Sequence, residues 1–354
     1  MEHSNALALI RCGISTFAEK RRSFKDIAHM RRAALKSAIA SLCFLSAGAA
    51  TAQDSRIVPT GAVERAYFAD GPSAVMRTTS SVPCDRRGHL CDVWYPSDIQ
   101  SGKPRPVVVW ANGTADAPVE PKVYDYLLSH LASWGFVVVA TRDPKTGYGD
   151  TVLDSLDYLK AQADAPASPI HRRVDLDRVG VAGHSQGATG AINAMLKAQG
   201  RIRTAVAFQL PSQRWCSPAD LCVLTENLRA AKSGSIFYVG GTFDVIISPD
   251  RQSDGEKLNS LTAYYEATPN VLLKAKGLVK LANHNDLLGK PGCGSAVVGS
   301  PLTCTLGVYG YLGLPTAWLA WQLQSSSEAG TAFRSDKGEF FTARAWSGQA
   351  SNVR

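Results

Sequence analysis

Short, continuously hydrophobic runs alternate with amphipathic stretches along most of this chain. Residues 106–110 (PVVVW) and 136–140 (FVVVA) contain no charged or hydrogen-bonding side chain apart from the indole of Trp110. Such runs are typical of strands that are buried on both faces of a sheet. Less regular runs predict further strands over residues 90–95, 178–182, 203–208 and 235–239, and within 271–281.

Helices are predicted between these strands. Over residues 122–134, apolar side chains recur three and four positions apart, and the pattern stops at Gly135, as expected of an amphipathic helix. Strands that alternate with helices predict an α/β fold, with a mainly parallel central sheet covered by helices on both faces. Further helices are predicted over residues 151–163, 186–198, 253–265 and 316–323, whereas residues 53–80 are predicted to be irregular or an edge strand.

The first 52 residues have the layout of a targeting segment. A basic start at residues 30–32 (MRR) is followed by a mostly apolar stretch at 37–45 and by small residues that end at Ala52. This order predicts a secretory signal peptide cleaved after Ala52, with Met30 as the true start. A longer basic leader or an amphipathic presequence is the alternative. Residues 53–354 are then one exported domain, secreted or periplasmic, because the apolar stretch is too short for a membrane anchor.

The net charge of +8 comes largely from this segment. Residues 1–52 hold eight Lys and Arg and three Asp and Glu, which leaves 30 basic and 27 acidic residues, a net of +3, in the rest of the chain. No basic run remains there, so nucleic acid is not an expected partner.

The cysteines agree with export. Six of them follow residue 52, and neighbour pairing is the simplest of the pairings that they allow. Disulfides persist in an oxidising compartment. No Cys-x-x-Cys occurs, so neither a zinc ribbon nor a redox motif is expected. The three sequence-local pairs are Cys84 with Cys91, Cys216 with Cys222, and Cys293 with Cys304.

The sequence Gly183-His184-Ser185-Gln186-Gly187 follows a predicted buried strand and precedes a predicted helix. A G-x-S-x-G pattern alone is weak, but a strand–turn–helix context is what a nucleophile elbow requires. In that turn, glycines are needed where a side chain would clash, and the serine hydroxyl is exposed. We therefore expect Ser185 to be a nucleophile.

A serine nucleophile needs a base. In this type of fold the order along the chain is serine, acid, histidine, and only His284 follows the elbow at a distance. It is expected to act as general base and then general acid; a surface loop histidine is the alternative. The histidines after residue 52 are His89, His130, His171, His184 and His284.

The acid is expected at the end of a strand between the elbow and His284. Asp244 fits this place, since it follows the run SIFYV and a Gly-Gly turn. Its predicted role is to orient His284 and to stabilise the imidazolium. Asp250 and Asp254 lie in a polar stretch, and Asp286, two residues from His284, is the other rival.

Two backbone N–H groups are expected to bind an oxyanion. Gln186 stands at the start of the helix after the elbow. Thr114 follows Gly113 in the loop after an early strand, where the second donor of such folds is found. An ordinary glycine turn is the alternative reading of that loop.

Together these segments resemble the α/β-hydrolase superfamily, and within it the secreted bacterial cutinase-like and polyester-hydrolase esterases, near the dienelactone hydrolases. The resemblance rests on WANGTADAP, LLSHLASWGFVVVA, GHSQGATGA, GGTFDVIISP and NHND. It implies ester hydrolysis through an acyl-enzyme without a cofactor. It also implies catalytic roles for Ser185, Asp244 and His284, and oxyanion roles for Thr114 and Gln186.

The chain departs from polyester hydrolases at two of these positions. Members of that group usually carry an aromatic residue where Thr114 stands, and Met where Gln186 stands. Both departures count against aromatic-polyester activity and leave esterase activity untouched. Trp215, in the loop of residues 209–231, is a candidate for contact with the substrate, although packing within the loop would explain it equally well.

The sequence therefore predicts a secreted serine hydrolase that cleaves a small-molecule or polymeric carboxylic ester. A serine peptidase or amidase on the same fold is the rival enzyme, and a non-catalytic binding protein is the rival from another class. The sequence has no G-x-G-x-x-G fingerprint, which argues against a dehydrogenase. It has neither H-E-x-x-H nor a cluster of His and Cys ligands, which argues against metal catalysis.

Overall fold

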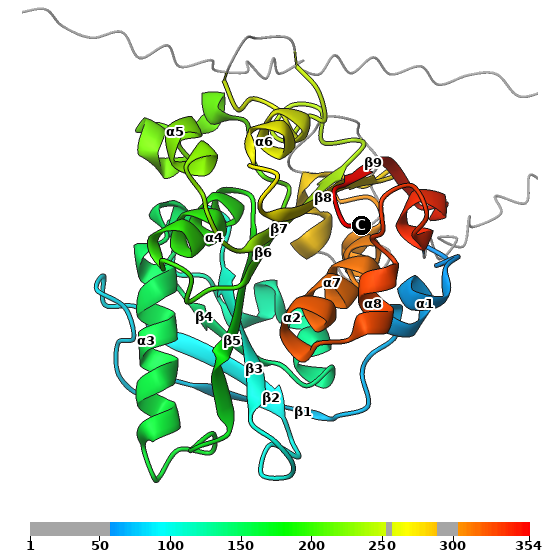
Figure 1. Ribbon diagram of the computed structural model, residues 1–354. Helices are drawn as coiled ribbons and strands as arrows, with labels where there is room; N and C mark the ends of the chain where they lie inside the picture. Colours follow the sequence, from blue (N-terminus) through cyan, green and yellow to red (C-terminus); the bar gives the residue numbers. More distant parts are fainter. Residues whose placement is uncertain (1–56, 253–256, 289–303) are drawn as a thin grey trace, which may run out of the picture. The chain divides into compact units, whose positions relative to one another are not determined.

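The computed structural model describes residues 57–252, 257–288 and 304–354. These residues form one nine-stranded sheet in the order β1-β2-β4-β3-β5-β6-β7-β8-β9 (Figure 1). The predicted signal peptide and its cleavage site lie outside the described residues. The strands are β1 (Val75–Thr79), β2 (Cys91–Pro96), β3 (Arg105–Ala111), β4 (Val137–Thr141), β5 (Val174–His184), β6 (Thr204–Phe208), β7 (Ser235–Gly241), β8 (Leu273–Val279) and β9 (Trp346–Ser351).

The prediction of a mainly parallel sheet is confirmed. Strands β3 to β8 pair in parallel, while β1, β2 and β9 join the two edges in antiparallel fashion. Helices α3 and α4 lie on one side of the sheet, and α2, α7 and α8 lie on the other (Figure 1). The helices are α1 (Ala62–Phe68), α2 (Asp125–Ser133), α3 (Asp150–Asp164), α4 (Gln186–Lys197), α5 (Thr225–Arg229), α6 (Leu261–Ala267), α7 (Gly313–Gln324) and α8 (Ser327–Thr331). None of the helices in the described residues is long and apolar enough to cross a membrane.

Strands β2 to β8 contribute to two hydrophobic cores, one on each face of the sheet. In β3, Val107 and Val109 pack beneath α3 and α4, whereas Val108 and Trp110 pack with α2 and α7. Because side chains alternate across a strand, a strand covered on both faces has no polar position. This is the physical origin of the continuous apolar runs in the sequence.

Three elements differ from the sequence predictions. Residues 53–80 contain helix α1 as well as edge strand β1. The Glu339 carboxylate accepts hydrogen bonds from the first N–H groups of α1, at Val63 and Glu64, so a distant residue caps this helix. Helix α6 is shorter than predicted, because Ser260 caps it by accepting from Ala263. Strand β9 was not predicted, since its sequence WSGQAS has no apolar run.

The order of the strands reverses at β3. The chain passes from β3 outward to β4 and then returns to β5 on the other side of β3. At such a switch point, the loops after the two central strands diverge and leave room for a ligand. The loops that follow β3 and β5 are those that carry Thr114 and Ser185.

Two disulfides follow the neighbour pairing of the cysteines. Cys84 is bonded to Cys91, and Cys216 is bonded to Cys222. Cys304 is disulfide-bonded as well, and its predicted partner Cys293 lies outside the described residues. These bonds fit an oxidising compartment.

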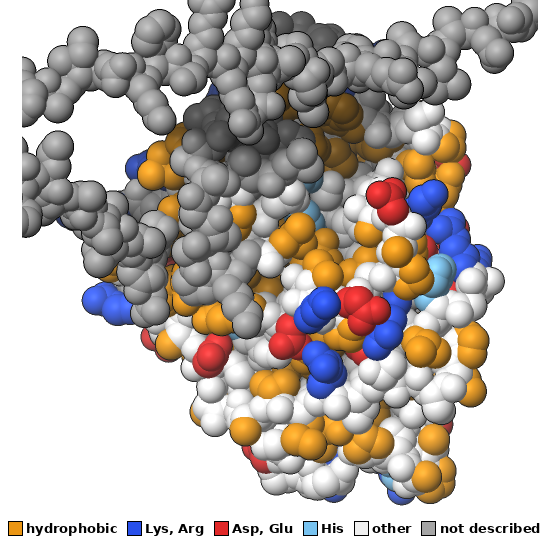
Figure 2. All heavy atoms as spheres, turned by 180° about the vertical axis from the view of Figure 1, so that it is seen from behind, with side chains coloured by type: hydrophobic (Ala, Val, Ile, Leu, Met, Phe, Trp, Pro, Cys, Tyr) orange, Lys and Arg blue, Asp and Glu red, His pale blue; other side chains and the backbone are white. Residues whose placement is uncertain are grey.

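Charged side chains of opposite sign lie next to one another on the face shown in Figure 2, with hydrophobic side chains scattered between them. Ion pairs of the described residues include Arg86 with Asp154 and Arg142 with Asp92, both at 2.8 Å. No field of a single sign dominates the described part of this face.

Candidate active site

The turn between β5 and α4 holds Ser185 in a strained conformation. Its φ of 56° and ψ of −127° lie in a region that residues other than glycine rarely adopt. A Cβ atom at Gly183 would collide with the carbonyl oxygen of Gly187, and one at Gly187 would collide with the carbonyl oxygen of Ala111. Only glycine therefore allows the strand, the turn and the helix to approach so closely.

Three predicted residues meet at the carboxyl ends of the parallel strands. Ser185 follows β5, Asp244 follows β7 and His284 follows β8. The Oγ atom of Ser185 is 2.9 Å from Nε2 of His284, and Nδ1 of His284 is 2.6 Å from Oδ2 of Asp244. Both distances are those of good hydrogen bonds.

The carboxylate of Asp244 determines which nitrogen of His284 carries the proton. It is buried, and its Oδ1 accepts from the backbone N–H groups of Ile247 and Ser248, both at 3.2 Å. A carboxylate can only accept, so Nδ1 of His284 donates to Oδ2. The lone pair on Nε2 then faces the Ser185 hydroxyl, as a general base requires.

The rival acids have other partners. Asp286 accepts from the backbone N–H of Asn283 at 2.9 Å and from the Thr305 hydroxyl at 2.7 Å. Burial raises the pKa of this carboxyl, and these hydrogen bonds lower it by less. Asp250 accepts from Nζ of Lys276 at 2.5 Å. Asp254 lies outside the described residues.

The two predicted oxyanion residues lie next to each other. The Thr114 hydroxyl donates to Oε1 of Gln186 at 2.6 Å. Gln186 is the first residue of α4, where a backbone N–H has no partner within the helix. The loop before Thr114 is anchored at Asn112, whose carbonyl oxygen accepts from the Thr146 hydroxyl at 2.8 Å. The side chain of Asn112 also donates to the carbonyl oxygen of Thr141 at 2.5 Å.

The sequence around this site matches a known protein family. The model of the PET hydrolase-like family matches residues 49–224. The chain belongs to the PET hydrolase-like family. At the level of that family, it is an ester-hydrolysing serine hydrolase with an α/β-hydrolase fold. The matched segment includes Ser185 but ends before Asp244 and His284, whose place in the site rests on their hydrogen bonds.

His184, the variable residue before the serine of the elbow, makes contacts that the G-x-S-x-G pattern did not predict. His184 is buried, its Nδ1 lies 3.0 Å from the Tyr124 hydroxyl and its Nε2 lies 2.9 Å from the carbonyl oxygen of His284. Burial, and secondarily the nearby His284, lower the pKa of His184 to about 3. The ring is therefore neutral wherever a histidine base can work.

This shift predicts a loss of stability in acid. The pKa of His184 falls from the ordinary 6.5 to about 3 on folding, so between these values the unfolded chain binds a proton that the folded chain does not. Stability is then lost as the pH falls from 6.5 toward 3. We expect the thermal midpoint of the natural protein to fall more steeply over this range than that of a His184→Gln variant. Equal slopes for the two proteins would contradict the lowered pKa of His184. Glu64 and Asp286, whose pKa values burial raises, are present in both proteins and so do not distinguish them.

Exposed apolar side chains lie close to the site in this PET hydrolase-like protein. Val245 and Ile246, directly after Asp244, are each nearly half exposed, as is Trp215. The indole N–H of Trp215 donates to the carbonyl oxygen of Ile246 at 3.0 Å. This hydrogen bond ties Trp215 to the loop after β7, while half of the side chain stays exposed. Trp110, a weaker candidate for contact with the substrate, is fully buried in the core instead.

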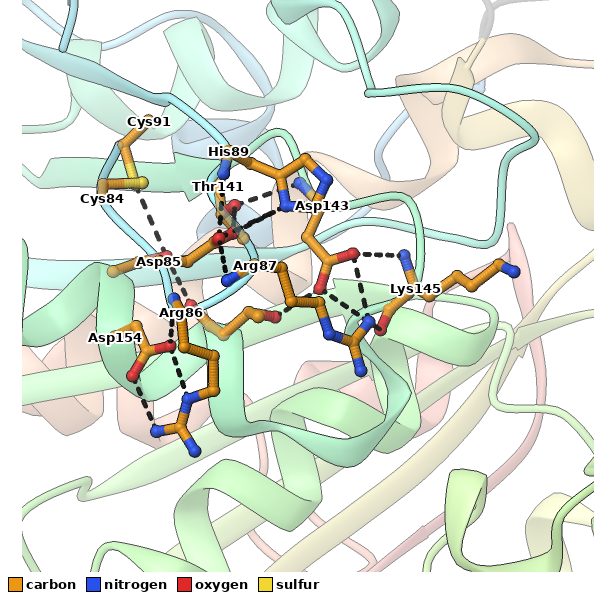
Figure 3. A network of polar contacts seen from close by, with 12 residues as sticks. Cys84, Asp85, Arg86, Arg87, His89, Cys91, Thr141, Asp143, Lys145 and Asp154 are labelled. Atoms are coloured by element: carbon orange, nitrogen blue, oxygen red, sulfur yellow. Dashed lines mark hydrogen bonds and ion pairs between the residues drawn. A yellow bond between two sulfur atoms is a disulfide. The ribbon is translucent and has the colours of Figure 1, made fainter. Parts of the chain in front are cut away.

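One group of side chains has the composition of a metal site. Ligand-type atoms of Asp85, His89 and Asp143 lie within 4.8 Å of one another (Figure 3). Both carboxylate oxygens of Asp85 already accept hydrogen bonds, from the N–H of His89 at 3.0 Å and from the Thr141 hydroxyl at 2.5 Å. The Arg87 guanidinium lies 3.3 Å from Asp143 and supplies a positive charge there. The group therefore ties the disulfide loop of residues 84–91 to the end of β4.

Proposed function

We propose that this protein hydrolyses carboxylic esters through an acyl-enzyme. Ser185 is the nucleophile, His284 is the general base and then the general acid, and Asp244 orients His284. The observation that carries the proposal is the unbroken line of hydrogen bonds from Ser185 through His284 to Asp244, at 2.9 and 2.6 Å. Membership in the PET hydrolase-like family supports the reaction class.

The reaction follows from the direction of these hydrogen bonds. Oγ of Ser185 attacks the ester carbonyl while its proton passes to Nε2 of His284. The imidazolium that forms is stabilised by Asp244 and then protonates the leaving alcohol. Water, deprotonated by His284, attacks the acyl-enzyme and releases the acid and the free serine.

The backbone N–H groups of Thr114 and Gln186 are proposed to bind the oxyanion of both tetrahedral intermediates. The N-terminus of α4 favours negative charge at Gln186. The hydrogen bond between the two side chains, at 2.6 Å, keeps the two donor segments together. Such donors typically contribute about 3 kcal/mol each to transition-state stabilisation.

The apolar surface near Asp244 supports an ester with an apolar acyl or alcohol part. Trp215, Val245 and Ile246 are each exposed enough to contact it. Thr114 and Gln186 offer a small hydroxyl and an amide, so neither of these two side chains can stack on a terephthalate unit as an aromatic ring would. We propose simple and aliphatic esters as better substrates than poly(ethylene terephthalate).

The protein is further proposed to be exported, secreted or periplasmic, with the mature chain beginning at Gln53. The disulfides Cys84–Cys91 and Cys216–Cys222 support this. One preparation tests location and activity together: the full chain is expressed in a bacterium that exports it. The mature N-terminus is then read by mass spectrometry, and an N-terminus that retains residues 30–52 would contradict cleavage after Ala52.

The same preparation is offered p-nitrophenyl esters from acetate to dodecanoate, amorphous poly(ethylene terephthalate) film and a peptide panel. We expect turnover of the short and medium esters, little release of terephthalate from the film and no peptide cleavage. Faster cleavage of peptides than of esters would instead favour the peptidase. A folded protein that is inert on all three substrates would favour a binding protein.

A further inference from the structure

The backbone around His284 is held by two buried side chains that take no part in the mechanism above. Nε2 of Gln209 donates to the carbonyl oxygen of Asn283 at 3.0 Å. Nε2 of His184 lies 2.9 Å from the next carbonyl oxygen along the chain, that of His284 itself. Both side chains are buried, so water does not compete for these hydrogen bonds.

The direction of the hydrogen bonds through His184 follows from its partners. A carbonyl oxygen only accepts, so Nε2 of His184 carries the proton and Nδ1 is an acceptor. Nδ1 therefore accepts from the Tyr124 hydroxyl, at 3.0 Å. The oxygen of that hydroxyl in turn accepts from the backbone N–H of Gly113, at 3.1 Å.

These contacts form one chain from the oxyanion loop to the base. It runs from the N–H of Gly113, the residue before Thr114, through Tyr124 and His184 to the backbone of His284. The neutral state of His184, enforced by burial, keeps the donor on Nε2 over the working range of pH. A shift of either loop would break a buried hydrogen bond.

Gln209 has an unfavourable backbone conformation and an unsatisfied polar atom. It stands at the end of β6 with a φ of 50°, a left-handed conformation that glutamine seldom adopts. Its Oε1 is buried without a hydrogen-bond partner among the described residues, although its amide nitrogen donates to Asn283 and, at 2.5 Å, to the Tyr311 hydroxyl. Strain and an unsatisfied polar atom together are typical of functional sites.

We propose that His184 and Gln209 are positioning residues that fix the backbone of His284, and that Tyr124 couples this backbone to the oxyanion loop through His184. The proposal rests on the proposed function, because it assigns these residues to the same active site. None of the three is assigned a contact with the substrate. Their effect is on the placement of the base relative to the oxyanion donors.

Tyr124→Phe is the first test, since it removes only the hydroxyl. We expect kcat on a p-nitrophenyl ester to fall about 10–100-fold, with KM changed less than about threefold, because misplacement of a catalytic group costs rate rather than binding. Tyr238→Phe is the matched control: Tyr238 is also buried, and among the described residues its hydroxyl bonds only to Thr268, at 2.7 Å. It is expected to lower the thermal midpoint to a similar extent and to leave kcat unchanged.

Variants at the other two positions separate positioning from packing. His184→Leu removes both hydrogen bonds, whereas His184→Gln keeps an N–H that can reach the carbonyl oxygen of His284. We expect His184→Gln to recover much of the kcat that His184→Leu loses. Gln209→Met keeps length and volume without a donor, and it is expected to lower kcat with little change in thermal midpoint, because an unsatisfied oxygen is removed as well.

The outcomes are distinguishable from a failure of the proposed function. Rates are expressed per folded enzyme, measured well below each midpoint, and Ser185→Ala supplies the background. If the natural protein does not exceed that background, the proposed function fails. If it does, but Tyr124→Phe retains its kcat or falls no further than Tyr238→Phe, the positioning proposal is wrong. Equal losses for His184→Leu and His184→Gln would also overturn it.

Discussion

Replacing Ser185 with alanine is expected to lower kcat on p-nitrophenyl butyrate by about 10⁴-fold or more, with little change in the thermal midpoint. The substitution removes the nucleophile and the hydrogen bond of 2.9 Å to His284. Alanine meets the same backbone strain at φ 56° as serine does, so the free energy of unfolding stays nearly the same. Steady-state kinetics, expressed per mole of folded protein, and thermal unfolding followed by circular dichroism measure the two quantities.

Ser101→Ala is the matched control for this measurement. Ser101 is an exposed turn residue between β2 and β3, and its hydroxyl donates to the carbonyl oxygen of Asp98 at 2.7 Å. Its removal is expected to leave the rate unchanged. Residual activity of Ser185→Ala above about one per cent of the natural rate would exclude Ser185 as the nucleophile, because such variants keep only binding and oxyanion stabilisation.

Replacing Asp244 with asparagine is expected to lower kcat by about 10³–10⁴-fold. An amide in this place can donate to Nδ1 of His284, which would move the ring proton to Nε2 and leave no lone pair to face the serine. The hydrogen bond of 2.6 Å from His284 to Asp244 is the observation behind this expectation. The loss should appear in kcat more than in KM, since the substrate does not touch the carboxylate.

The variant Asp286→Asn tests whether Asp244 or its rival Asp286 orients His284. Asp286 lies two residues from His284, but its carboxylate accepts from Asn283 and Thr305. We expect this variant to lose less than about tenfold in kcat, because it disturbs the loop without changing the tautomer of His284. A larger loss for Asp286→Asn than for Asp244→Asn would reverse the assignment of the two carboxylates.

Features that depend on near neighbours in the chain could be predicted from the sequence alone. Strands β3 and β4 follow from runs of valine, because a strand covered on both faces requires apolar residues at every position. The tight turn of the elbow follows from Gly183, because a Cβ there would collide with the carbonyl oxygen of Gly187, four positions further along the chain. The mainly parallel sheet and the position of Ser185 were therefore determined locally.

Features that depend on residues far apart in the chain were decided only by the tertiary structure. Helix α1 is capped by Glu339, and β9 forms by pairing with β8, so neither leaves a local pattern. In the sequence, His184 is only the variable residue before the serine of the elbow. The fold places it between the Tyr124 hydroxyl and the backbone of His284. Spacing in the sequence favoured Asp244 but left Asp286 as a rival, because the choice rests on which carboxylate the fold directs at the imidazole. Hydrogen bonds form between atoms that the whole fold brings together, and their partners are therefore set by the packing of the strands rather than by the order of the residues.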